Sequence, residues 1–89
     1  MKAVITVVGK DRTGIIARVS NYLAEKKINI LDISQTIMQD LFTMIMLVDT
    51  NASDIDAATL SGDLDKIGEE MALTINMQHE GLFTSMHRI

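Results

Sequence analysis

Hydrophobic and polar residues follow two different periods along the chain, and each change of period marks the border of an element. Residues 3–8 are β-branched and almost continuously apolar, which predicts a central strand covered on both faces. Between residues 15 and 27 the period changes, and Ile15, Val19 and Leu23 form one apolar stripe. That spacing predicts an amphipathic helix.

The middle of the chain predicts two strands joined by a tight turn. Residues 29–38 alternate between apolar and polar side chains, which indicates a half-exposed strand. Gln39 and Asp40 form a polar break, and residues 42–48 are apolar on both faces apart from Thr43. The pattern therefore predicts a hairpin. The alternation is carried by Leu31, Ile33 and Ile37 on one face and by Asp32, Ser34 and Thr36 on the other.

A second helix and a fourth strand follow. We expect Ser53 or Asp54 to cap a helix that runs to about Met71. Gly62 and Gly68 weaken this helix by roughly 1 kcal/mol each relative to Ala, and we expect Gly62 to mark an irregularity or a close approach to another element. The buried positions expected in the helix and in the strand over residues 73–77 are Leu60, Leu64, Ile67 and Met71, then Leu73, Ile75 and Met77.

Residues 80–89 form an amphipathic tail. Leu82, Phe83, Met86 and Ile89 recur at helical spacing, which predicts a short C-terminal helix. Because so short a helix is unstable alone, we expect it to dock on its own sheet or on a partner subunit.

The order β-α-β-β-α-β predicts an α+β protein of the ferredoxin-like class. That plan has a four-stranded antiparallel sheet with both helices on one face, here followed by the short C-terminal helix. A chain of 89 residues is expected to be a single domain, residues 1–89, with a core over residues 3–79 and the tail over 80–89.

Charge and composition exclude several classes of function. The net charge is −4, and the eight Lys and Arg residues are scattered, so no basic surface is expected for nucleic acid. With aromatic residues at 3%, no platform for stacking bases is expected either. The absence of cysteine removes disulfides, thiolate nucleophiles and cysteine metal sites, and fits a reducing compartment.

We expect a cytoplasmic protein with no membrane partner, no cofactor and no metal. The first strand begins almost at Met1, which leaves no room for a signal peptide. No apolar run approaches the roughly 20 residues that cross a bilayer. His79 and His87 lack the i, i+4 spacing that would place both on one helical face.

The candidate functional site is the loop between the first strand and the first helix. At such a helix start, the amides of Thr13, Gly14 and Ile15 can bind a carboxylate. Asp11 is expected to cap the helix or to accept from a ligand ammonium group, and Gly14 to allow close backbone approach. The loop consists of Gly9, Lys10, Asp11, Arg12, Thr13 and Gly14, of which Lys10 and Arg12 are most simply read as solvated cations.

The fold class is shared by unrelated activities, and the sequence removes some of them. A metal chaperone of this class would need a cysteine pair in the first loop, and an RNA-recognition module would need exposed aromatics on its central strands, where only Phe42 is present. A small phosphohydrolase of the acylphosphatase type stays open, with Arg12 beside a phosphate held by the loop.

Residues 4–16 (VITVVGKDRTGII) together with residues 28–30 (INI) carry a family resemblance. Over residues 3–79 the chain resembles an ACT domain, in particular small stand-alone bacterial and archaeal ACT proteins. It is similar, more distantly, to the ACT regions of glycine-cleavage repressors and formyltetrahydrofolate deformylases. Many ACT loops have Pro before the glycine where this chain has Thr13, so the identity of a ligand does not transfer.

The resemblance implies a non-catalytic regulatory module that acts as a homodimer and signals to another protein. It implies a small-molecule ligand, commonly an amino acid, held between the first loop of one subunit and the second strand of its partner. By position, Asp11 matches a polar ligand-contacting residue of the loop, and Gly14 matches the glycine that allows close approach. Asn29 matches a polar contact offered by the partner subunit, whose second strand begins with Asn29, Ile30 and Leu31. A constitutive interaction protein that has lost its ligand is the alternative within the family.

Overall fold

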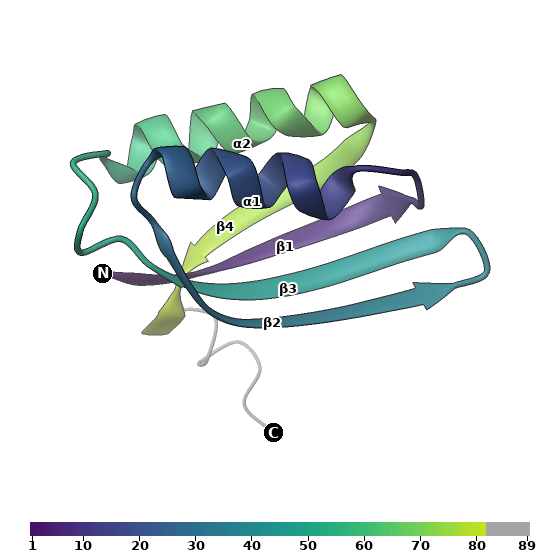
Figure 1. Ribbon diagram of the computed structural model, residues 1–89, viewed down its shortest axis with the longest axis horizontal. Coiled ribbons are helices and arrows are strands. Elements are labelled where there is room, and N and C mark those ends of the chain that lie inside the picture. Colours follow the sequence, from purple (N-terminus) through teal and green to yellow (C-terminus); the bar gives the residue numbers. More distant parts are fainter. Residues whose placement is uncertain (82–89) are drawn as a thin grey trace.

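The fold is a single antiparallel sheet covered on one face by two helices (Figure 1). The computed structural model describes residues 1–81. The sheet has the strand order β2-β3-β1-β4, so that β2 and β4 form its edges. The elements are β1 (Lys2–Lys10), α1 (Ile15–Glu25), β2 (Asn29–Met38), β3 (Leu41–Asp49), α2 (Ala57–Met71) and β4 (Leu73–His79).

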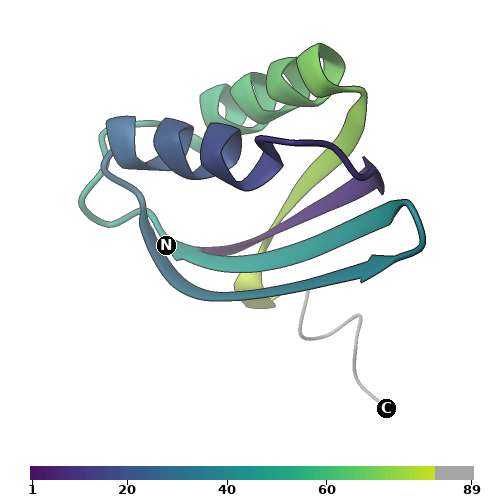
Figure 2. The same cartoon turned by 45° about the vertical axis from the view of Figure 1, so that its right-hand side comes forward.

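The βαββαβ order, the antiparallel sheet and the ferredoxin-like class are confirmed. The predicted hairpin is present, with Gln39 in the left-handed region at φ 57° between β2 and β3. Both helices lie on the same side of the sheet in two views (Figures 1 and 2). The predicted C-terminal helix falls on residues 82–89, which lie outside the described residues.

The core lies between the helices and the sheet. The predicted stripe of α1, Ile15, Val19 and Leu23, is buried there together with Tyr22. The strands contribute alternate residues, because side chains along a strand point to opposite faces. The strand residues of this cluster are Ala3, Ile5 and Val7, then Phe42, Met44, Met46 and Val48, then Leu73 and Ile75, while α2 supplies Leu60, Leu64 and Ile67.

The predicted cap of α2, Ser53 or Asp54, is wrong by three or two residues. Asp56 is the N-cap, and its Oδ1 accepts a hydrogen bond from the Thr59 amide at 2.7 Å. Ser53 instead accepts from the Ile55 amide at 3.2 Å, which forms a turn before the helix. The hydrogen bonds from Thr59 lower the pKa of Asp56. Several residues here can make local side-chain hydrogen bonds, and the last of them, Asp56, is the one that caps α2.

Two expectations about exposure are wrong in part. The helices cover only one face of β1; along the other face the exposed fraction rises from 5% at Val4 to 39% at Val8. Strand β2 was predicted to be half-exposed and is more exposed than that: of its residues only Ile30 is half-buried. The reason is its position at the edge of the sheet. Ile33 and Ile37 are on the helix face, opposite Met46 and Phe42, yet remain 42% and 52% exposed.

Candidate functional site

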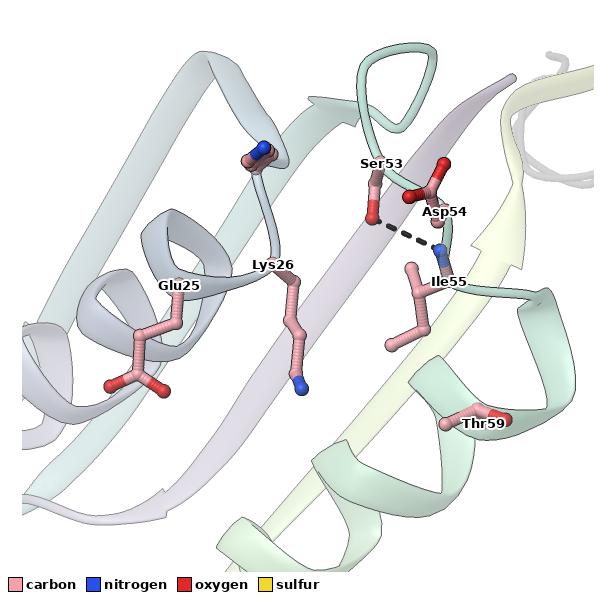
Figure 3. A pocket seen from close by; sticks show the side chains of 7 residues that line it. Glu25, Lys26, Ser53, Asp54, Ile55 and Thr59 are labelled. Carbon is pink, nitrogen blue, oxygen red and sulfur yellow. Dashed lines mark hydrogen bonds between the residues drawn. The ribbon is translucent and has the colours of Figure 1, made fainter.

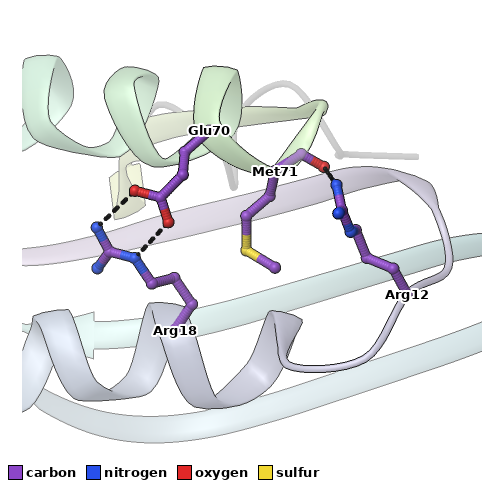
Figure 4. Close-up of polar contacts among 4 residues, drawn as sticks. All are labelled: Arg12, Arg18, Glu70 and Met71. Atoms are coloured by element: carbon purple, nitrogen blue, oxygen red, sulfur yellow. Dashed lines mark hydrogen bonds and ion pairs between the residues drawn. The ribbon is translucent and has the colours of Figure 1, made fainter.

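The loop from Gly9 to Gly14 lies between two turns at one end of the sheet. On one side, the Asp11 amide donates to the Asp40 carbonyl in the β2–β3 turn at 2.6 Å. On the other side, Nη1 of Arg12 donates to the carbonyl of Met71 at 2.9 Å (Figure 4). These two hydrogen bonds fix the loop to parts of the chain that are distant in sequence.

Arg12 is therefore more than the solvated cation that its sequence context suggests. Met71 is the last residue of α2, and its carbonyl lies at the negative end of the helix dipole. A guanidinium at that position satisfies a carbonyl that has no partner within the helix. Lys10 is exposed at the end of β1 and conforms to the expectation of a solvated cation.

Helix α1 begins at Ile15, and the predicted Asp11 cap is wrong. Gly14 is the N-cap with φ 92° and ψ 2°, and no side chain caps the helix. A Cβ built at Gly14 would meet nothing within 4 Å. The glycine is thus required by its left-handed backbone and not by close approach of another element. The chain needs two further residues after Asp11 to turn into the helix, which leaves that carboxylate exposed in the loop.

At Gly9, in contrast to Gly14, another element of the chain approaches the backbone closely. A Cβ at Gly9 would lie 2.6 Å from Cδ2 of Leu73 and 3.3 Å from the Ala72 carbonyl oxygen. The start of β4 thus passes directly over this end of β1. The small residue allows the α2–β4 turn to reach the loop.

A groove of about 260 Å³ runs between the loop, the first turn of α1 and strand β2. Its polar groups come from Asp11, Arg12 and Gln35, and its floor includes Ile37 and Phe42. Gln35, Ile37 and Phe42 were not among the site residues predicted from the sequence. The sequence contains a sign of the role of Gln35, because this polar residue interrupts the row of apolar residues that Ile33 and Ile37 form on β2. The residues that line the groove are Asp11, Arg12, Gly14, Ile15, Ile16, Ala17, Gln35, Ile37 and Phe42.

Two neighbouring hollows also border the loop. One of about 270 Å³ lies between Lys10, Asp11 and Arg12 and the α2–β4 turn at Met71 and Ala72. The other, of about 370 Å³, lies between the end of β1 and the β2–β3 turn. The loop thus contributes to each of three hollows at this end of the molecule, and Thr13 is exposed beside them.

Within one chain, the predicted ligand contacts at the start of β2 lie at the end of the sheet opposite the loop. Asn29 pairs with Asp49, which pairs with Lys2, whereas the loop begins at Lys10. The length of β1, roughly 26 Å at 3.3 Å per residue, separates the two ends. Asn29 is exposed, and an irregularity in the pairing of β2 surrounds Leu31, which is 42% exposed. One chain therefore does not bring the two halves of the predicted site together.

A further cavity of about 360 Å³ lies at that opposite end, between the end of α1 and the start of α2 (Figure 3). Its lining includes both signs of charge, with Glu25, Lys26 and Asp54 around Ile55. None of these residues belongs to the predicted site. In the part of the chain from 1 to 81, no group of three or more His, Asp or Glu residues could hold a metal ion, and no helix is long and apolar enough to span a membrane.

Two polar links also connect α1, whose first turn borders the groove, to α2. Arg18 binds Glu70 through two nitrogens, at 2.9 and 3.2 Å (Figure 4). That pair raises the pKa of Arg18 and lowers the pKa of Glu70. Tyr22 donates to Oδ2 of Asp63 at 2.6 Å, and burial together with this hydrogen bond raises the pKa of Tyr22.

Comparison with known proteins identifies relatives of this chain. The family model described as the ACT domain matches residues 2–78. A UPF0237 protein of Clostridium acetobutylicum is 56% identical over 89 residues, which is 100% of both chains. Among solved structures, the ACT domain protein from Streptococcus pneumoniae superposes with a TM-score of 0.82 at 42% identity, with 93% of each chain covered.

Two larger proteins contain a similar fold in part of their chains. A protein described as a glycine cleavage system transcriptional repressor matches with a TM-score of 0.72 at 27% identity, over 89% of this chain and 47% of its own. A formyltetrahydrofolate deformylase from Pseudomonas putida matches with a TM-score of 0.80 at 15% identity, over 89% of this chain and 29% of its own, and so shares the fold alone. The sequence resemblance predicted a similarity to both of these classes of protein.

Proposed function

The chain belongs to the ACT domain family, and from this membership we propose a non-catalytic regulatory module that binds an amino acid between two copies of the chain. The observation that carries the proposal is the position of the 260 Å³ groove. It joins the uncapped start of α1 to the exposed edge strand β2. A ligand in the groove would therefore lie where a second subunit can reach it.

The edge strand supports a homodimer. An edge strand has unpaired backbone groups that can pair with another chain. On β2 these accompany exposed apolar side chains, among them Leu31, Ile33, Ile37 and Met38. Burial of that surface against a second copy would be favourable, because about 25 cal/mol is gained per Å² of apolar area removed from water.

Antiparallel pairing of two β2 strands would also complete the predicted site. A two-fold axis through the middle of β2 places Asn29 of one chain beside the partner's Met38. Met38 lines a hollow together with Gly9 and Lys10 at the base of the loop. The start of β2, with Ile30 and Leu31, would thus approach the loop of the other subunit, although roughly 26 Å separates them within one chain.

The chemistry of the groove suits an amino acid. The α-carboxylate would bind the free amides at the start of α1, where the helix dipole also favours an anion. The exposed carboxylate of Asp11 would accept from the α-ammonium group, and Gln35 offers an amide to either. At about 260 Å³ the groove lies just below the ~300 Å³ lower range of small-molecule pockets, which favours a small metabolite.

No described contact favours the phosphohydrolase alternative. That mechanism requires Arg12 for phosphate, whereas Nη1 of Arg12 donates to the Met71 carbonyl. The other alternative, a constitutive interaction module, would form the same dimer and would differ from the proposed function only in binding no ligand. Regulation by a ligand requires that it bind one arrangement of the subunits more tightly than another, and the signal would then pass to an effector protein.

Calorimetric titration of the protein with each of the common amino acids tests the proposal. We expect at least one to bind, and Asp11→Asn to weaken its affinity about tenfold or more, because a hydrogen bond to a charged group contributes roughly 1.5–3 kcal/mol. Asp65→Asn is the matched control, since Asp65 is also exposed, lies on α2 and lines none of the hollows at the loop. It should leave the affinity unchanged.

Two outcomes would reject this assignment. If none of the amino acids binds, the constitutive interaction module replaces it. If one binds and both variants weaken it equally, the effect comes from net charge, and the ligand does not contact Asp11.

A further inference from the structure

The sheet has a second face, opposite the helices (Figure 2). The centre of this face is uncharged. Residues paired across antiparallel strands share a face, so the pairing identifies its members. Within residues 1–81 the charged side chains of this face lie only at its rim, at Lys2, Lys10, Asp32 and Asp49. Its central positions are Val4, Thr6 and Val8 on β1, Thr43, Ile45 and Leu47 on β3, Ser34 and Thr36 on β2, and Thr74, Asn76 and Gln78 on β4.

An uncharged centre is unusual for a face that meets water. One face of an antiparallel sheet commonly faces solvent and then carries polar and charged residues. Here the two central strands contribute Val4, Val8, Ile45 and Leu47 to that side. In a chain with 22% charged residues, this composition indicates a face that is covered by further protein.

Exposure along the open face is lowest at one end. Val4 is buried, Thr6 is half-buried and Val8 is 39% exposed. Val4 is not a member of the core cluster between helices and sheet, because it projects from the other face. The most apolar and least exposed part of the face is thus the end that contains Val4 and Leu47.

The chain leaves the sheet at that same end. Strand β4 finishes beside it, with Gln78 paired to Val4 and His79 paired to Ala3. A hydrogen bond from the Gly81 amide to Nδ1 of His79, at 3.1 Å, turns the chain directly after the strand. The described structure therefore ends next to the apolar part of the open face.

The following segment has the composition and the length to cover it. Residues 82–89 include Leu82, Phe83, Met86 and Ile89 and no acidic residue. Eight residues span about 12 Å as a helix and up to about 28 Å when extended. Four strands at about 4.8 Å spacing are about 14 Å across, so the segment reaches the centre of the face in either conformation.

We propose that residues 82–89 dock on the open face of their own sheet, with Leu82, Phe83, Met86 and Ile89 against Val4, Ile45 and Leu47. The segment then acts as a cover for the face that the helices leave open. The proposed ligand groove lies on the helix side of the sheet, so this inference is independent of the proposed function.

A spin label tests the docking directly, because the chain has no cysteine to interfere. We would attach a nitroxide to Ser85→Cys, a polar position that leaves the four apolar residues intact, and record amide spectra of the ¹⁵N-labelled full chain. The amides of Thr6, Ile45 and Asn76 should be broadened more strongly than those of Asp65 and Glu69, which are exposed on α2. Equal broadening on both sides of the molecule would overturn the proposal.

A mixed sample distinguishes the same chain from a second copy. Spin-labelled chains without ¹⁵N, mixed with unlabelled ¹⁵N chains, should not broaden Asn76, which lies on β4 far from the proposed β2 interface. Broadening of Asn76 in that sample would mean that the segment docks on another chain, and would refute docking on its own sheet. In the Ser85→Cys background, Phe83→Ser should abolish the broadening, whereas the matched change His87→Ser should keep it.

Discussion

At the scale of single residues, Gly14 determines how the site is built. Its left-handed backbone starts α1 without a side-chain cap and leaves the first helical amides open. Asp11, which the sequence predicted as the helix cap, is held earlier in the loop by the hydrogen bond from its backbone amide to the carbonyl of Asp40. The backbone at this one position thus separates a carboxylate from a set of amides, which is the arrangement that a zwitterionic ligand requires.

Replacement of Gly14 by alanine should destabilise the fold. The new side chain has space, since nothing lies within 4 Å, but a left-handed backbone costs a non-glycine residue about 1–2 kcal/mol. We expect the free energy of unfolding in urea to fall by about that amount.

Gly62→Ala is the matched control, because it also has nothing within 4 Å and lies inside α2. Within residues 1–81 the expected close approach to Gly62 is therefore absent, and alanine there should raise stability by about 0.5–1 kcal/mol. If both variants changed stability in the same direction, backbone conformation would not be the cause.

At the scale of elements, two polar links fix α1 against α2. The Arg18–Glu70 pair is exposed, with 40% and 55% of the two side chains accessible, so solvent screens much of its strength. The hydrogen bond from Tyr22 to Asp63 is shorter and adjoins the core. The Lys26 ammonium group lies 6.0 Å from the centre of the Tyr22 ring, near the limit for a cation–π contact.

The Tyr22–Asp63 link predicts a loss of stability in alkali. The pKa of Tyr22 is raised in the folded state from the ordinary 10.0 by burial and by the bond to Asp63. Above pH 10 the unfolded chain therefore releases the phenol proton while the folded chain keeps it, so the free energy of unfolding falls as the pH rises. This contribution is fully present below pH 10.

Tyrosinate absorbance measures this effect without interference, because Tyr22 is the single tyrosine and the chain has no tryptophan. The folded protein should titrate at higher pH than the protein in urea. Tyr22→Phe should cost about 1 kcal/mol at neutral pH and should remove the tyrosine part of the alkaline decline. A phenol that titrates at the same pH in both states would disprove the link.

At the scale of the whole molecule, the topology determines which surfaces remain for other chains. Both helices pack over one face, β2 forms an edge, and the loop and the start of β2 lie at opposite ends of the sheet. A site made of both must therefore include a second copy. This arrangement would connect ligand binding to the association of subunits.

A lysine on the edge strand should produce monomers. Ile33 lies on β2 with 42% of its side chain exposed, and a charge there would have to be buried in the proposed dimer. We expect Ile33→Lys to sediment as a monomer and to lose amino-acid binding. Ile45→Lys is the matched control on the open face, where 40% is exposed, and it should still sediment as a dimer. Dissociation of both variants, or of neither, would contradict an interface on β2.

The sequence by itself determined the local elements and their order. The β-branched run in β1, the alternation in β2 and the stripes of the two helices each report how the chain buries apolar side chains close by in sequence. They predicted all four strands and both helices, because those patterns depend on local periodicity. The family was inferred separately, from the resemblance of residues 4–16 and 28–30 to an ACT domain. The first loop was identified as the candidate site for the same reason, since two glycines there separate a strand from a helix.

Only the tertiary structure decided which contacts those elements make. It assigned Arg12 to the end of α2, gave the close approach to Gly9, made Asp56 the cap of α2 and added Gln35, Ile37 and Phe42 to the groove. It also left β2 and one face of β1 less covered than their apolar patterns predict. Apolar periodicity specifies that a surface is to be buried, but the partner that buries it is set by chain topology, which brings residues together across many positions of sequence.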